Sequence, residues 1–160
     1  MMTTALQMKP VNDTTPAPVT RHRGEHANSS LTSAQIAAFI RSDLKDAMKA
    51  GGLPTMKVSV TARSYSMGQS VTVRIVTVPF AILNPDRVRE VAADRFGDSD
   101  LPRLTPRASQ ILARIEAIMA EYTRSDTDSH SDLYNTNCHM DAKFDHDTME
   151  SERTAILASK

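Results

Sequence analysis

Two segments in the middle of the chain alternate between apolar and polar residues, and this alternation constrains the fold more than any other feature. In residues 56–63 the apolar positions are Met56, Val58, Val60 and Ala62. In residues 70–75 they are Val71, Val73 and Ile75. A period of two is typical of a β-strand with one buried face and one face in water. The connection between the segments is short and contains Gly68, so the pattern predicts a β-hairpin.

The polar positions of this hairpin share the face of the sheet that is not buried. The candidate binding residues on this face are Lys57, Arg63, Tyr65 and Arg74. Cations can contact a phosphate backbone, and a tyrosine ring can stack on a base. Sheets that bind single strands usually present several aromatic residues, however, whereas Tyr65 stands nearly alone. A nucleic acid, a protein partner and a merely solvated face therefore all stay open.

Three helices are expected around the hairpin, over residues 33–50, 85–96 and 106–122. The first has an apolar residue at every fourth position, which gives one buried stripe. Thr32 and Gln35 have the spacing of a capping box at its start. The second and third helices each begin with a capping residue followed by proline, which is a common helix start.

Residues 138–145 alternate again and predict a short third strand. The expected fold is an α+β domain in which a small antiparallel sheet, the hairpin plus the third strand, is packed on one face by three helices. Residues 1–31 are rich in Thr, Pro, Asn and Ser and are expected to be a disordered N-terminal tail. Residues 32–146 are expected to form the single domain, and residues 147–160 are expected to be a polar tail with one helical turn near its end.

Charge is unevenly distributed, although the net charge is zero. Residues 1–120 hold 15 Lys and Arg against 10 Asp and Glu, and residues 121–160 hold 4 against 9. A basic body with an acidic end indicates contact with nucleic acid, or an acidic segment that folds back over a basic face. Tuning of solubility would give the same pattern.

Several classes of protein are not expected. No apolar run approaches the ~18–20 residues of a membrane span, and the N-terminus lacks the apolar stretch of a signal peptide. The single cysteine, Cys138, fits a reducing compartment, so a cytoplasmic location is expected. No motif for a cofactor, a metal or a catalytic residue is present, and none of these is expected.

The alternative function is a small hydrolase or metal-dependent enzyme that uses the Ser-, Asp- and His-rich segments at residues 125–132 and 139–146. The first segment lacks the glycine-flanked serine turn that would supply an oxyanion hole. The second has no spacing typical of a zinc or calcium site. Binding without catalysis is therefore the leading hypothesis.

Part of the chain resembles a known family. IRSDLK at residues 40–45 leads into MKVSV at residues 56–60 and YSMGQS at residues 65–70. This is similar to a large polyvalent protein-associated domain family, in which a helix is followed by a K-F-S-V strand, a Y-S-G-G-S-S turn and a second strand. Met67 and Gln69 depart from that turn, and residues 76–79 lack the family's W-T-D-G-P. The resemblance implies an accessory protein of a phage or plasmid that acts on a host protein, against host defence, or on nucleic acid.

Overall fold

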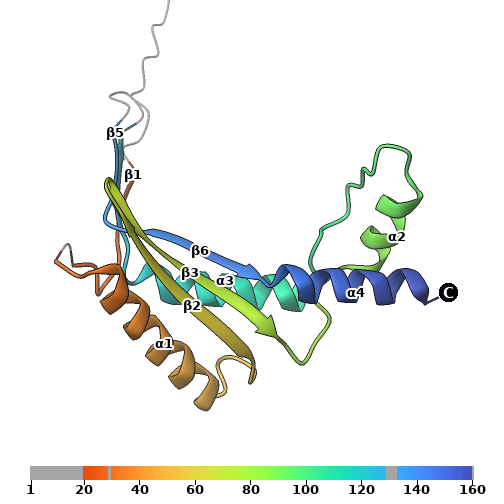
Figure 1. Cartoon of the computed structure of the whole chain (residues 1–160), viewed down its shortest axis with the longest axis horizontal. Coiled ribbons are helices and arrows are strands. Elements are labelled where there is room, and N and C mark those ends of the chain that lie inside the picture. Colours follow the sequence, from red (N-terminus) through yellow and green to blue (C-terminus); the bar gives the residue numbers. More distant parts are fainter. Residues whose placement is uncertain (1–19, 29, 129–132, 160) are drawn as a thin grey trace, which may run out of the picture.

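The computed structural model describes residues 20–28, 30–128 and 133–159. The elements in chain order are β1 (Thr20–Arg23), α1 (Ser33–Lys49), β2 (Lys57–Tyr65), β3 (Gly68–Thr77), α2 (Pro85–Ala93), α3 (Pro106–Ala120), β4 (Arg124–Asp128), β5 (Leu133–Thr136), β6 (His139–Phe144) and α4 (His146–Ala158). They form a main sheet with strand order β2-β3-β6 and a second sheet with strand order β1-β4-β5 (Figure 1).

The main sheet has the expected hairpin at its centre. Strands β2 and β3 are antiparallel, and Val60 lies opposite Val73. The third strand, β6, is present but runs parallel to β3, with Ala142 opposite Val73. The α+β class with a small sheet packed against helices is confirmed, whereas the expected wholly antiparallel sheet is corrected to a mixed one. A parallel neighbour requires a long crossover, which the chain between β3 and β6 supplies.

One face of the main sheet is buried under α1 and α3, as Figure 1 shows. The apolar positions that alternate along the strands point into this core, as expected. The largest fully buried side chains are Ile36, Ile40, Leu44, Val71, Val73, Ile75, Ile82, Ile115, Met119 and Cys138. Burial of such side chains is the main stabilising term of the fold.

Helix α2 does not share this core. It packs against α4, and neither helix contains a buried residue. Together they form a lobe that projects from the body (Figure 1). The prediction that three helices cover the sheet therefore holds for α1 and α3 only. The apolar side chains of α2, Val88 and Val91, line a hollow together with Met149 of α4, so they face α4 and not the sheet.

The second sheet lies where the sequence predicted a tail and a polar loop. β1 pairs with β4, and Arg23 lies opposite Arg124. The predicted N-terminal tail thus differs from the structure at β1, whereas residues 1–19 lie outside the described part of the chain. After β1 the backbone passes close to the end of α3. A Cβ atom on Gly24 would lie 2.2 Å from the carbonyl oxygen of Ala120, so only glycine fits there.

Tyr122 joins the end of α3 to α1. Its buried ring stacks on Phe39, with ring centroids 6.0 Å apart, and its hydroxyl donates a hydrogen bond to Asp43. Burial raises the pKa of the Tyr122 hydroxyl, and the hydrogen bond to the Asp43 carboxylate raises it further. The hydroxyl therefore stays protonated and keeps its role as donor.

The C-terminal segment is a helix rather than the expected polar tail. Asp145 caps α4 by accepting a hydrogen bond from the backbone N–H of Thr148. Further along, the Glu152 carboxylate accepts hydrogen bonds from the backbone N–H groups of Ile82 and Leu83, at 2.8 and 2.9 Å. These contacts fix α4 to the chain that follows β3. Within the described residues, no helix has both the length and the apolar character that crossing a membrane requires.

Candidate functional site

The face of the main sheet that points away from α1 and α3, called here the open face, contains a hollow of about 370 Å³. All three strands of the main sheet contribute to its wall. The lining residues are Ser59, Thr61, Arg63, Ser70, Thr72, Arg74 and Lys143. The hairpin register explains this set, because Ser59, Thr61 and Arg63 lie directly opposite Arg74, Thr72 and Ser70. Three cations and four hydroxyl groups therefore surround one concave surface.

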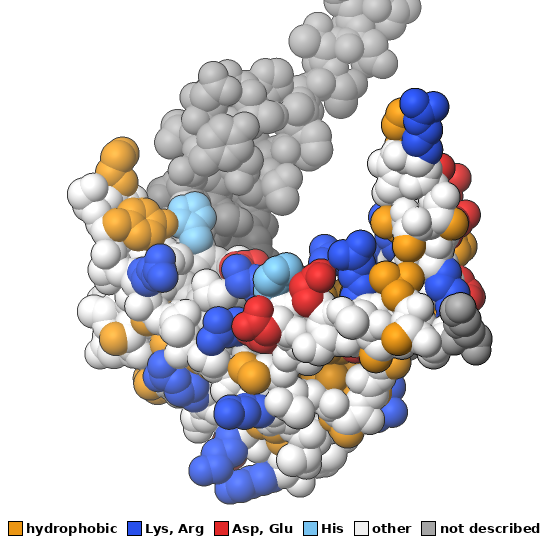
Figure 2. Space-filling model, turned by 45° about the vertical axis from the view of Figure 1, so that its right-hand side comes forward, with side chains coloured by type: hydrophobic (Ala, Val, Ile, Leu, Met, Phe, Trp, Pro, Cys, Tyr) orange, Lys and Arg blue, Asp and Glu red, His pale blue; other side chains and the backbone are white. Residues whose placement is uncertain are grey.

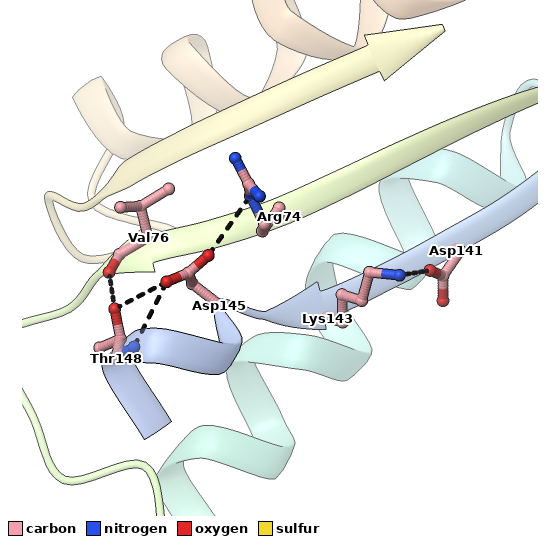
Figure 3. Close-up of polar contacts among 6 residues, drawn as sticks. All are labelled: Arg74, Val76, Asp141, Lys143, Asp145 and Thr148. Atoms are coloured by element: carbon pink, nitrogen blue, oxygen red, sulfur yellow. Dashed lines mark hydrogen bonds and ion pairs between the residues drawn. The ribbon is translucent and has the colours of Figure 1, made fainter. Parts of the chain in front are cut away.

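Two of the three cations pair with carboxylates on the same face. The Nε of Arg74 lies 3.4 Å from an oxygen of Asp145, and the Nζ of Lys143 lies 2.8 Å from an oxygen of Asp141 (Figure 3). Thr148, near the start of α4, contacts the same strand as Asp145 does: its hydroxyl donates a hydrogen bond to the backbone carbonyl of Val76 in β3, at 2.8 Å. Arg74 and Lys143 are more than half exposed, so these pairs are screened by water and weak.

Arg63 differs from its two neighbours in the hollow. No ion pair involves its guanidinium within residues 20–28, 30–128 and 133–159, and its side chain is exposed. An anion can therefore bind Arg63 without first displacing a carboxylate of the described residues, whereas at Arg74 and Lys143 it has to displace Asp145 or Asp141.

Acidic and basic groups are also mixed on the wider surface. In the view of Figure 2, Lys and Arg side chains lie among Asp, Glu and His side chains rather than in one continuous patch. The carboxylates Asp141 and Asp145 belong to the acidic end of the sequence. That end thus places negative charge beside the cations of the open face, through β6 and the start of α4.

The structure separates the four binding residues expected from the sequence. Arg63 and Arg74 line the hollow. Tyr65 lies at the hairpin end of the same face, opposite Gly68, with 49 % of its side chain exposed. Lys57 does not join them: the register shifts between Lys57 and Val58, and Lys57 lines a different, shallower surface near Pro79.

Lys143 was missed as a binding residue. The alternation over residues 138–145 does place His139, Asp141 and Lys143 on one face of a strand. It does not reveal which strand is the neighbour, and only the pairing with β3 brings Lys143 opposite Arg74 and His139 opposite Ser70. The sequence therefore indicates that Lys143 lies on the polar face of its strand, but it does not indicate that this strand pairs with β3.

The residues of the enzyme alternative do not form a site in the described part of the chain. His139 and Asp141 are exposed on β6, and Cys138 is buried, which raises the pKa of its thiol. Residues 129–132, which carry the Ser-His-Ser-Asp sequence, lie outside the described residues. Among the residues that are described, no three His, Cys, Asp or Glu side chains gather as metal ligands.

A second hollow, of about 300 Å³, lies between α2 and α4. Two of the arginines that line it already have partners. Arg87 donates to the carbonyls of Ser99 and Leu101, and Arg153 pairs with Glu150 at 3.5 Å. The open face is the better candidate for a binding site, because it adds four hydroxyl groups to its three cations, whereas the hollow between α2 and α4 is lined in part by the apolar side chains of Val88, Val91 and Met149.

The chain was compared with family models, with curated proteins and with solved structures, and no match was found in any of the three. The resemblance to a polyvalent protein-associated domain therefore stays an expectation.

Proposed function

We propose that the chain is a non-enzymatic binding module whose open face contacts the phosphate backbone of a nucleic acid. The observation that carries the proposal is the convergence of Arg63, Arg74 and Lys143 with four hydroxyl groups around one hollow. Arginine, lysine, serine and threonine side chains are the usual donors to phosphate oxygens. The face thus offers both charge and hydrogen bonds to the same ligand group.

The charge of the open face sets the expected strength of binding. Asp141 and Asp145 offset part of the charge of the three cations. Affinity should therefore be modest and should fall as salt rises. Three phosphate contacts with a single strand give a slope of roughly −2 in a plot of log K against log salt concentration.

The resemblance supplies the biological setting of this proposal. It favours an accessory protein of a phage or plasmid that acts in a bacterial cytoplasm, on nucleic acid or against host defence. If the chain does not bind nucleic acid, a host protein becomes the proposed partner. In both cases the open face is the surface of contact.

The test is a triple substitution, Arg63→Ala, Arg74→Ala and Lys143→Ala. Fluorescence anisotropy with labelled DNA and RNA at low and physiological salt should show binding by the unaltered chain and its loss, by at least about tenfold, in the triple variant. The matched control is Lys45→Ala, Lys49→Ala and Arg114→Ala, which removes the same charge from exposed positions on α1 and α3. No binding by the unaltered chain at low salt, or an equal loss in the control, would disprove the proposal.

Removing a competing carboxylate should have the opposite effect. Asp141→Asn eliminates the partner of Lys143 and raises the charge of the open face by one. We expect the affinity for nucleic acid to rise by a factor of about three to five, which corresponds to an exposed ion pair. Asp46→Asn, an equal neutralisation on the exposed side of α1, should leave the affinity unchanged. An unchanged affinity with Asp141→Asn would mean that the ligand does not approach Lys143.

A further inference from the structure

Tyr65 has an unusual position at the hairpin end of the open face. Opposite it is Gly68, and the ring lies over this glycine: a Cβ atom at position 68 would be 3.1 Å from Cε2 and 3.3 Å from the hydroxyl oxygen of Tyr65. Because glycine has no side chain, the ring can lie close to the neighbouring strand. About half of the tyrosine side chain stays exposed, at 49 %. The result is an aromatic ring supported from below and open to solvent.

This ring lies beside Arg63, the cation of the hollow that forms no ion pair with a carboxylate in the part of the chain that the structure describes. Tyr65 and Arg63 are two residues apart on β2 and therefore point to the same side of the sheet, about 7 Å apart along the strand. Ser70, which lies opposite Arg63, adds a hydroxyl group at the same place. The flat ring of Tyr65, the guanidinium of Arg63 and the hydroxyl of Ser70 are thus adjacent. A nucleotide offers a complementary group to each of them: its base can stack on the ring, and its phosphate can accept hydrogen bonds from the guanidinium and the hydroxyl.

We propose, on the basis of the function proposed above, that the ligand of the open face is a single-stranded nucleic acid, with one base stacked on Tyr65. The adjoining phosphate lies against Arg63, and the backbone continues along the hollow toward Arg74 and Lys143. Inside a duplex both faces of a base are covered by its neighbours, so an aromatic ring can stack on the bases only at the two ends. In a single strand the bases are free to stack on an aromatic side chain, whatever their identity.

The experiment compares Tyr65→Ala with Tyr65→Phe by anisotropy, using a labelled ten-nucleotide oligothymidylate. Tyr65→Ala should weaken binding about tenfold, and Tyr65→Phe, which keeps the ring, should bind within about twofold of the unaltered chain. Met67→Ala is the matched control, because Met67 is an exposed apolar residue of the same hairpin, 93 % exposed, and has no part in the stack. Circular dichroism of each variant checks that the fold is intact.

Two further probes separate this inference from the proposed function. An abasic strand of equal length keeps the phosphates and lacks the bases, so Tyr65→Ala should not alter its binding. A duplex of the same length should bind more weakly than the single strand. If the duplex binds as tightly as the single strand, or if Tyr65→Ala leaves oligothymidylate binding unchanged, the inference is wrong although the phosphate-binding function stands. If no strand binds, the proposed function fails as well.

Discussion

Ile75→Ala is expected to lower the free energy of unfolding by about 3 kcal/mol, because it opens a cavity at a site that cannot collapse. Ile75 is fully buried in β3, the central strand of the main sheet. It lies opposite Val58 of β2 on one side and Phe144 of β6 on the other. All three strands and the helices beneath them therefore limit how far the core can relax around the missing atoms.

Chemical denaturation followed by far-ultraviolet circular dichroism measures this effect. Ile75→Val, which removes a single methylene, should cost about 1 kcal/mol. Met67→Ala, at an exposed hairpin position, should stay within about 0.5 kcal/mol of the unaltered chain. Equal stability of Ile75→Ala and Met67→Ala would mean that β3 is not the centre of the core.

Glu152→Ala is expected to have the second largest effect on stability, at about 2–3 kcal/mol. The carboxylate of Glu152 accepts hydrogen bonds from the backbone N–H groups of Ile82 and Leu83, and both of these residues are buried. Without it, these two N–H groups lose their described partner. A hydrogen bond to a charged acceptor contributes more than one between exposed neutral groups, and in this partly buried place water replaces the lost bond only in part.

Glu150→Ala provides the comparison on the same helix. The Glu150 carboxylate is half exposed, and its contact among the described residues is an ion pair with Arg153 at 3.5 Å, so its loss should cost at most about 0.5 kcal/mol. Limited proteolysis adds a local readout, because α4 should be cleaved sooner in Glu152→Ala than in Glu150→Ala. Similar stability and similar cleavage of the two variants would show that Glu152 does not fix α4 to the body.

The features that could be predicted from the sequence are those that depend on near neighbours. The capping box of Thr32 and Gln35 is confirmed, and so are the proline-containing starts of α2 and α3, with Asn84 and Thr105 as N-caps. The hairpin is confirmed for the same reason: its pairing is determined by alternation and by a short turn. Each of these local structures is determined by residues that are close together in the sequence.

The features that could not be predicted depend on contacts between distant segments. The direction of β6, the pairing of β1 with β4 and the contact of Glu152 with Ile82 all join segments that are far apart in sequence. Lys57 shows a second limit. Strict alternation placed it with Arg63. In the structure the pairing of β2 with β3 is irregular beside Lys57, because Val76 of β3 has no partner in the register, and Lys57 at the start of β2 lies near Pro79 instead of in the hollow.

The parallel pairing of β3 with β6 has a consequence for synthesis of the chain on the ribosome. Strand β3 ends at Thr77 and β6 begins at His139, so one edge of the central strand waits for its neighbour while residues 78–138 are translated. During that interval β3, with its apolar residues Val71 and Val73, offers an open edge to any other strand, which is the condition that favours aggregation. Chains that terminate before His139 keep that edge permanently and should accumulate as insoluble protein.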